Sequence, residues 1–251
     1  MSKIQKFIKK LIFIIYLSSF FSFADTDIFT VIDNSSRENC SFKGDIFTEY
    51  IAMNGNTRKF NFSNRTMLTW FQKINAYSLL VGASNNSTDG HRNLEKYQAG
   101  IRAKHNLNYD NYLFTQSYWL SDRYNGYHSL NTFTGGYGSL VLKGPIHNLL
   151  FEIGPGVRHE EYFRGGRSTK TLISFTALYA YQLTNNTKFD QKTSILAYSD
   201  ITINSQTGLN VNINDYLTLK IAYNITWNNY IPKNLKKNID TKTSLFLVYH
   251  I

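Results

Sequence analysis

Hydrophobic and polar residues alternate with a period of two along most of the chain after Lys43. In residues 217–228, large apolar or aromatic side chains occupy every second position from Leu217 to Trp227, and mostly polar side chains fill the positions between them. Residues 201–213 repeat the pattern. A helix, with its period of 3.6, would not keep either set on one face. A strand would turn one set to lipid and the other to water, which predicts an all-β, transmembrane, antiparallel up-and-down β-barrel.

About twelve such segments follow one another, separated by clusters of Asn, Asp and Gly. Their ranges are 43–53, 58–70, 76–84, 95–106, 111–121, 128–142, 147–160, 169–183, 187–199, 201–213, 216–229 and 240–251. Short connections alternate with longer ones, such as Asn85–Leu94 and Tyr230–Ile239, as expected for periplasmic turns and outer loops. The connections around Gly55 and Asp200 are shorter than this scheme expects, so ten or fourteen strands are also compatible with the pattern.

The end of the chain carries a separate signal, because Leu245, Leu247, Tyr249 and Ile251 alternate up to the last residue. Outer-membrane barrels commonly end in this way, with a closing strand that the barrel-assembly machinery reads, although Phe is more usual than Ile at the final position. The rival interpretation is a periplasmic β-sandwich, which would bury its alternating face against a second sheet. The aromatic content of 16% and the 3 prolines favour strands with interfacial aromatic girdles.

The first residues have the features of a secretory signal peptide. Four lysines precede an apolar run from Leu11 to Phe23, which is too short for a transmembrane helix, and small residues precede Asp25. We therefore expect a signal peptide at 1–24 with cleavage after Ala24, a periplasmic segment at 25–42 and a barrel at 43–251 in the bacterial outer membrane. An uncleaved anchor is the alternative, whereas Cys40 lies too far from the cleavage site for a lipoprotein.

The net charge is +10 for the whole chain, from 27 Lys and Arg against 17 Asp and Glu. Four lysines leave with the predicted signal peptide, so the mature chain carries +6. This balance suits anionic lipopolysaccharide or anionic solutes, but it is also ordinary for a basic proteome. The single cysteine excludes an intrachain disulfide. The expected partners are outer-membrane lipids, lipopolysaccharide and, during insertion, the assembly machinery; the sequence does not indicate an oligomeric state.

Several pieces of the chain resemble one known family. They are Gly55-Asn56-Thr57, residues 121–127 (SDRYNGY), residues 153–158 (IGPGVR), Tyr230 with Pro232, Asp240-Thr241 and Leu247-Val248-Tyr249. In order and spacing they resemble the YdiY-like, salt-induced outer membrane protein family, domain of unknown function 481, over nearly the whole mature chain. The resemblance implies an outer-membrane barrel and an association with osmotic or salt stress. It implies no catalytic residues.

Outer-membrane enzymes need particular groups of side chains close together. A phospholipase of this kind needs His and Ser two residues apart on one lipid-facing side, but His128 and Ser129 are adjacent and face opposite ways. Protease or lipid A deacylase sites would need groups such as Asp89 with His91, Asp122 with His128, or His159 with Glu160 and Glu161 to converge at the outer rim. Solvated loop charges are the simpler interpretation. No metal, cofactor, nucleotide or nucleic-acid pattern is present, and Gly154-Pro155-Gly156 indicates a bulge or bend.

The inside of the barrel is the remaining candidate site. If the apolar face of each strand points outward, the interior is polar and mainly basic, and it contains Arg65, Lys96, Arg102, Lys104, Glu152, Arg158, Glu160, Lys170, Lys188, Asp190, Lys192 and Lys220. Buried charges must pair or stay hydrated. One hypothesis is a narrow water-filled path for small anionic solutes. The other is a closed polar core in which Glu152 and Glu160 neutralise Arg102, Arg158 and their neighbours. A non-enzymatic barrel is favoured over an outer-rim lipase, deacylase or protease.

Overall fold

The computed structural model describes residues 41–53, 59–88, 91–123, 126–229 and 238–251. The predicted signal peptide at 1–24, the cleavage site after Ala24, nearly all of the 25–42 segment and Cys40 lie outside the described residues. The sequence around Gly55 and the pair Tyr230 and Pro232 lie outside them too. Within these described ranges, no helix is long and apolar enough to cross a membrane.

Twelve antiparallel strands form one closed barrel in which each strand pairs with its neighbours in the chain and β1 pairs with β12. The strands are β1 (Phe42–Met53), β2 (Lys59–Gln72), β3 (Asn75–Thr88), β4 (His91–Asn106), β5 (Asn111–Asp122), β6 (Tyr127–Lys143), β7 (His147–Tyr162), β8 (Arg167–Thr184), β9 (Thr187–Ala197), β10 (Ile201–Asn214), β11 (Leu217–Asn228) and β12 (Ile239–His250). The up-and-down barrel of twelve strands predicted from the alternating pattern is therefore confirmed.

The connections lie at two ends, which we call the turn end and the loop end. At the turn end, where β1 begins and β12 finishes, the bounds leave only two residues between β2 and β3, between β8 and β9, and between β10 and β11. At the loop end, ten residues separate β11 from β12. The prediction that Asn85–Leu94 is an outer loop is wrong, because β3 continues to Thr88 and β4 begins at His91. Polar side chains at the rim do not prevent the backbone ladder from continuing.

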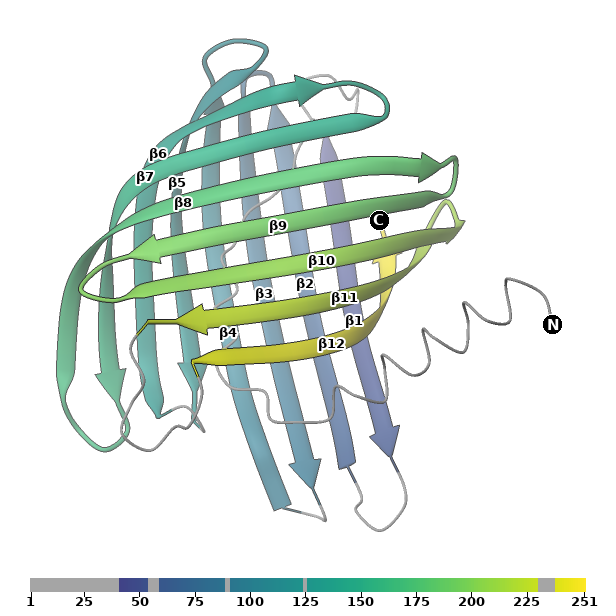
Figure 1. The fold of residues 1–251 in the computed structure, drawn as a ribbon. Helices are drawn as coiled ribbons and strands as arrows, with labels where there is room; N and C mark the ends of the chain where they lie inside the picture. The colour runs from purple at the N-terminus through teal and green to yellow at the C-terminus, as the bar shows by residue number, and fades with distance from the viewer. Residues whose placement is uncertain (1–40, 54–58, 89–90, 124–125, 230–237) are drawn as a thin grey trace.

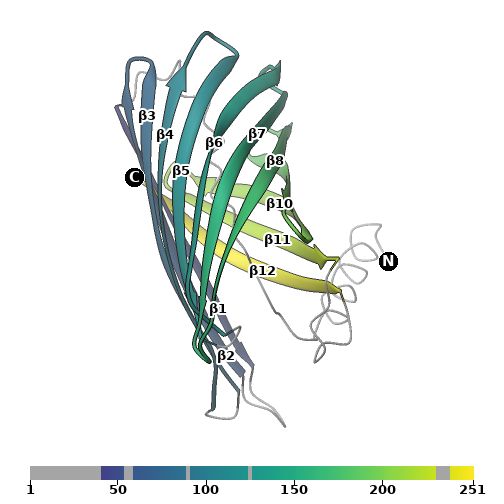
Figure 2. The same ribbon diagram turned by 90° about the vertical axis from the view of Figure 1, so that its left-hand side faces the viewer.

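The barrel is flattened and strongly twisted rather than round. Figure 1 shows β9–β12 crossing in front of β1–β5 at a steep angle, while β6–β8 curve from one wall to the other. The side view in Figure 2 shows the same long, tilted strands and the sharp divergence of β11 and β12 from β3 and β4. The interior is therefore the space between two crossing walls.

The seam between β1 and β12 is short and is fastened near both ends by side chains. Its register runs from Asp45 opposite His250 to Glu49 opposite Phe246. His250 Nδ1 lies 2.6 Å from Asp45 Oδ1, and Lys242 Nζ donates to Glu49 Oε2 at 3.2 Å. These contacts join residues about two hundred positions apart and close the ring without a free edge.

The alternation in β5 shows which face is inside, because Tyr112, Phe114 and Leu120 are buried and Leu113 and Trp119 are exposed to the outside. The expectation of a uniformly polar interior is therefore wrong for this part of the barrel. Leu80, Tyr118, Leu120 and Leu130 form one interior apolar cluster, and Tyr112, Phe114, Leu150 and Leu178 form another. A strand between lipid and a packed core is apolar on both faces, so alternation alone cannot decide its orientation.

The outer face is also less uniform than predicted, since a polar cluster lies midway along β9 and β10. Gln191 Nε2 donates to Ser205 Oγ at 2.8 Å, and Thr207 Oγ1 donates to Gln191 Oε1 at 2.5 Å. Thr193 is a further neighbour of the Gln191 amide, at 3.4 Å. Because the amide finds partners within the cluster, it can lie on an outward face without unsatisfied polar groups.

Candidate functional site

The structure places all twelve charged residues proposed for the interior on the inward faces of their strands. The interior divides into two parts of different character. The filled half, formed by β3–β8, contains Lys96, Arg102, Lys104, Glu152, Arg158, Glu160 and Lys170. The hollow half, formed by β9–β12 with β1 and β2, contains Arg65, Lys188, Asp190, Lys192 and Lys220. The twelve charged residues, which the sequence analysis treated as one group, therefore form two groups, and only the second lines the cavity described below.

A buried ion pair between Arg102 on β4 and Glu152 on β7 lies at the centre of the filled half. Both side chains are nearly inaccessible, at 2% and 3% exposure, and the guanidinium contacts the carboxylate through both terminal nitrogens. Gln116 Oε1 accepts a hydrogen bond from Arg102 at 2.8 Å, and the guanidinium carbon lies 4.6 Å from the centre of the Phe114 ring. The charges are therefore paired and desolvated together, which closes this part of the interior.

Tyr112 completes this cluster through a glycine on the strand beside it. Tyr112, Gly138 and Glu152 are registered neighbours on β5, β6 and β7. A Cβ on Gly138 would overlap the Tyr112 ring, so the glycine leaves room for the ring to lie across β6. The Tyr112 hydroxyl then donates to Glu152 Oε1 at 2.6 Å. Lys104 Nζ lies 4.2 Å from the centre of the same ring, which places this lysine within the packed cluster.

A second network closes the filled half toward the loop end. Lys170 Nζ lies 3.3 Å from Glu160 Oε2, and Tyr162 donates to the same oxygen at 2.7 Å. Arg158 and Lys170 both lie over the ring of Tyr198, at 5.4 Å and 4.9 Å. Glu152 pairs with Arg102 and Glu160 with Lys170, a neighbour of Arg158 on the adjacent strand, as expected for a closed polar core.

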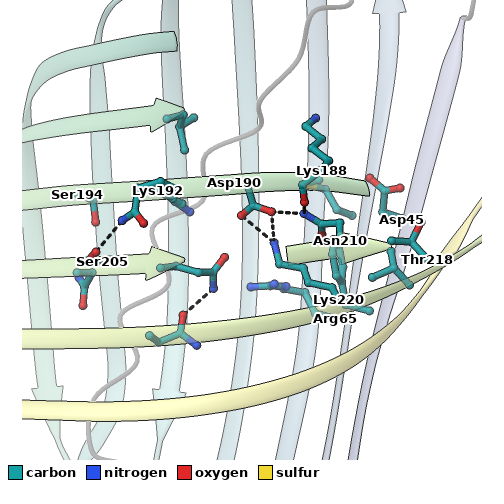
Figure 3. A pocket seen from close by; sticks show the side chains of 18 of the residues that line it. Asp45, Arg65, Lys188, Asp190, Lys192, Ser194, Ser205, Asn210, Thr218 and Lys220 are labelled. Atoms are coloured by element: carbon teal, nitrogen blue, oxygen red, sulfur yellow. Dashed lines mark hydrogen bonds and ion pairs between the residues drawn. The ribbon is translucent and has the colours of Figure 1, made fainter. Parts of the chain in front are cut away.

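The hollow half contains a cavity of about 530 Å³ between β9–β12 and the opposing β1 and β2. On β10 and β11 its lining extends from Asn212 and Thr218, beside the turn end, to Asn204 and Thr226, near the loop end. Five cationic side chains line it, namely Lys43, Arg65, Lys188, Lys192 and Lys220, against two carboxylates, Asp45 and Asp190. Cations thus outnumber carboxylates by three among these lining residues. Figure 3 labels all of these groups except Lys43 among the side chains that line the cavity.

The Asp190 carboxylate is held by neighbours on two further strands. Gly208 on β10 is registered with it, and a Cβ there would lie 2.6 Å from the carboxylate oxygens, so the glycine makes room for this group. Asp190 then reaches Lys220 on β11, whose Nζ donates to it at 3.1 Å and 3.2 Å. Asn210 Nδ2 also donates to Asp190. Figure 3 marks these contacts around the carboxylate. They neutralise one acid and leave the surrounding surface basic.

Several interior residues were missed by sequence reasoning. They are Lys43, Asp45, Glu49, Asp122, Asp240, Lys242 and His250, together with the cavity amides Gln182, Asn204, Gln206, Asn210, Asn212 and Asn224. The amides did stand at inward positions of the alternating pattern, so their orientation was available. Their hydrogen bonds and their position around one cavity could not be predicted, because asparagine in a sequence most often indicates a turn.

Among the described residues, the constellations considered for an enzyme come together only in part, since His159 Nε2 lies 3.7 Å from Glu161 Oε1 whereas the other groups stay apart. Asp122 is buried inside, whereas His128 is exposed and its ring packs against Phe163 at 5.0 Å. His159 hydrogen-bonds to Thr169 at 2.8 Å on the outer face, while Glu160 lies inside. The side chains of Asp89 and His91 lie outside the described residues. In the part of the chain that the structure describes, no group of three His, Cys, Asp or Glu side chains could hold a metal ion.

Comparison with known proteins assigns the family. The model of the family described as "Protein of unknown function, DUF481" matches residues 50–251, which is most of the chain. The chain belongs to this DUF481 family. A relative with 42% identity over 226 residues, 90% of each chain, is the "Uncharacterized protein YdiY" of Escherichia coli strain K12. The resemblance inferred from the sequence is therefore confirmed.

Solved structures similar to this DUF481 chain share its fold at low sequence identity. An outer membrane channel from Pseudomonas putida F1 superposes with a TM-score of 0.54 at 9% identity, covering 83% of this chain and 94% of the channel. The translocator domain of the autotransporter NalP from Neisseria meningitidis gives a TM-score of 0.50 at 9% identity, covering 85% of this chain and 89% of the domain. The fold of this DUF481 protein is thus that of an outer-membrane β-barrel.

Proposed function

We propose that this protein is a narrow, non-enzymatic channel of the bacterial outer membrane whose hollow half admits small anionic solutes. The observation that carries the proposal is the cavity of about 530 Å³, lined by five cationic side chains and two carboxylates. Basic side chains that line a wet passage favour anions. The lining extends along most of the length of β9–β11, as a passage along the barrel requires.

The residues that determine selectivity are those of the hollow half. Lys104 and Arg158, which the sequence indicated as lumen groups of equal weight, lie in the filled half against Tyr112 and Tyr198. They belong to the packed interior and line no part of the cavity. In this proposal the passage is off-centre, bounded on one side by the packed cluster around Arg102 and Glu152.

Reversal potentials in planar lipid bilayers test the proposal. The refolded protein is placed in a potassium chloride gradient, and we expect discrete current steps with chloride preferred over potassium. Exchanging Lys188 and Lys192 for Gln together lowers the chloride preference, because two cationic charges leave the cavity lining. Lys104→Gln is the matched control in the filled half and leaves the preference unchanged. Preference for potassium in the unaltered protein would refute the proposal.

A closed structural barrel is the second candidate, and the filled half is the observation that favours it. The buried pair of Arg102 and Glu152 and the apolar clusters occlude this part of the interior. If the hollow half were closed as well, the refolded protein would give no current steps at any voltage. Silence in the same recordings would therefore select this second candidate.

The proposal includes the route to the membrane and its contacts there. Residues 1–24 act as a signal peptide cleaved after Ala24, the assembly machinery inserts the barrel, and lipopolysaccharide and phospholipids surround it. The alternating apolar outer face and the exposed aromatic side chains support this placement. N-terminal sequencing of protein from the outer-membrane fraction should begin at Asp25. The association with salt stress, which rests on the family resemblance, is tested by protein levels at low and high osmolarity.

A further inference from the structure

A pair of amide side chains lies on the inner face of the hollow half. Gln206 on β10 and Asn224 on β11 are registered neighbours, and both line the cavity. Gln206 Nε2 donates to Asn224 Oδ1 at 2.7 Å. Lys192 on β9 is registered with Gln206, and Lys242 on β12 with Asn224, so two lysines flank the amide pair across four strands.

The bond within the pair leaves one acceptor and one donor beside the cavity. Gln206 keeps its carbonyl oxygen Oε1, and Asn224 keeps its amino group Nδ2, since neither atom bonds to another of the described residues. Chloride and sulfate accept hydrogen bonds but donate none, so they cannot satisfy the carbonyl oxygen. A hydroxyl group both donates and accepts. The pair is therefore matched to an alcohol, and two neighbouring hydroxyl groups could use both of its free positions.

The rest of the lining has the same mixed character. Beside the cationic groups, the cavity surface carries hydroxyl and amide side chains from Ser194, Thr218, Thr226, Gln182, Asn204, Asn210 and Asn212. Neutral groups that both donate and accept are not needed to attract a simple anion, for which the lysines suffice. They are the groups that replace water around a solute with many hydroxyls.

The volume also indicates a solute larger than an inorganic ion. At about 530 Å³, the cavity falls within the range of roughly 300–1,000 Å³ found for sites that hold small organic molecules. Arg65, which extends from β2 on the opposing wall, and Lys192 from β9 line this same space. Arg65 and Lys192 thus place a cationic side chain on each of the two walls that border this space.

We propose that the cavity binds polyhydroxylated carboxylates of the sugar-acid class. The cationic side chains hold the carboxylate, and the pair of Gln206 and Asn224 exchanges hydrogen bonds with two hydroxyl groups of the same molecule. This inference rests on the proposed admission of anions and specifies which anions are retained. Simple anions pass with little retention, because only the cationic groups act on them.

Block of the chloride current by three solutes tests the inference. Glucuronate has the charge and the hydroxyls, cyclohexanecarboxylate has the charge and a similar ring without hydroxyls, and glucose has the hydroxyls without the charge. We expect glucuronate to block the unaltered protein at a concentration about ten-fold lower than either of the others, a factor within the range expected from two additional net hydrogen bonds. Equal block by glucuronate and cyclohexanecarboxylate overturns the inference and leaves the channel function standing.

A variant without the amide pair separates the contribution of the pair to glucuronate binding from that of the cationic side chains. Replacing Gln206 and Asn224 together by Leu should raise the blocking concentration of glucuronate about ten-fold, because the hydrogen bonds to its hydroxyl groups are lost. Unchanged block by glucuronate would refute the role of the pair. Calorimetric titration of glucuronate into detergent-solubilised protein gives a second measurement. If the protein gives no current but binds glucuronate in a way that depends on the amide pair, this inference stands and only the proposed channel function is refuted.

Discussion

The filled and hollow halves are built from the same kind of strand and closed into one ring, yet their interiors are opposite in character. In the filled half, Arg102 and Glu152 are paired and almost inaccessible beside aromatic rings. In the hollow half, Lys188 is exposed, and the pair of Lys220 and Asp190 borders the cavity at 14% and 13% exposure. The barrel wall therefore determines the shape of the interior, while the inward side chains determine whether it is packed or open.

In both halves, a glycine on one strand lets a side chain from the preceding strand contact the strand that follows. Tyr112 reaches across Gly138 to Glu152, and Asp190 reaches across Gly208 to Lys220. The glycine on the middle strand supplies the space in each case. The difference lies in the crossing side chain, since an aromatic ring fills the interior and a short carboxylate leaves room beside it.

The largest expected effect comes from breaking the buried pair of the filled half. Glu152→Gln keeps the shape of the side chain but leaves Arg102 as an uncompensated buried charge, which should cost about 3–5 kcal/mol in the free energy of unfolding. Urea denaturation in lipid vesicles, followed by tryptophan fluorescence, measures this. The double replacement of Arg102 by Met and Glu152 by Leu should recover most of the loss. A loss below about 1 kcal/mol for the single variant would contradict the assigned pairing.

Arginine placed on the outer face should show that the two halves differ only inside. Ile153 on β7 and Ile221 on β11 lie on the outward faces of their strands, one in each half. Ile153→Arg and Ile221→Arg should each destabilise the folded barrel by about 2–4 kcal/mol if they lie near the membrane midplane. Vesicle refolding yields and urea titrations measure both. Tolerance at either position would show that its face is turned away from lipid.

Alanine substitutions at three glycines compare the crossing side chains directly. Gly138→Ala displaces the Tyr112 ring and should cost about 1–3 kcal/mol. Gly208→Ala displaces only the mobile end of Asp190 and should cost less. Gly135→Ala meets its nearest atoms at an ordinary 3.5 Å and serves as the control. Thermal unfolding curves rank the three, and a loss for Gly208→Ala equal to that for Gly138→Ala would remove the contrast between the halves.

The smallest expected change in stability belongs to Lys220→Gln in the hollow half. Its ion pair with Asp190 lies beside an open cavity, so removing it should cost no more than about 1 kcal/mol. The same variant should reduce the preference for chloride, because one cation leaves the lining and Asp190 becomes uncompensated. Urea titration and reversal potentials on one sample measure both effects. A loss as large as that for Glu152→Gln would mean that this half is packed as well.

The sequence predicted the strands well where outward positions are apolar and most inward positions are polar, as they are along β11. Period-two alternation located β10 and β11 within one or two residues of their bounds. It failed for Asn85–Leu94, where polar residues at the rim resembled a loop although the backbone ladder of β3 and β4 continues. Hydrogen bonding between backbones at a rim does not depend on apolar side chains.

The division of the interior could not be predicted from the same pattern. Arg102 and Glu152 are fifty residues apart, and their pairing depends on the register of β4 to β7 and on how the walls cross. The inward orientation of Tyr112 and Leu120 could not be predicted from the sequence either, since β5 is apolar on both faces. The inward position of Lys220 followed from the alternation, but the cavity beside it depends on small and polar residues from six other strands.

The short seam between β1 and β12 has a consequence for how the ring is made. Within the described strands, every other ladder joins neighbours in the chain, whereas this one brings together residues 205 positions apart, such as Asp45 and His250. Such a distant contact carries the greatest entropic cost and forms late. We therefore expect the two side-chain contacts near the ends of this seam to form last when the barrel closes. We expect the same seam to open first when the barrel unfolds.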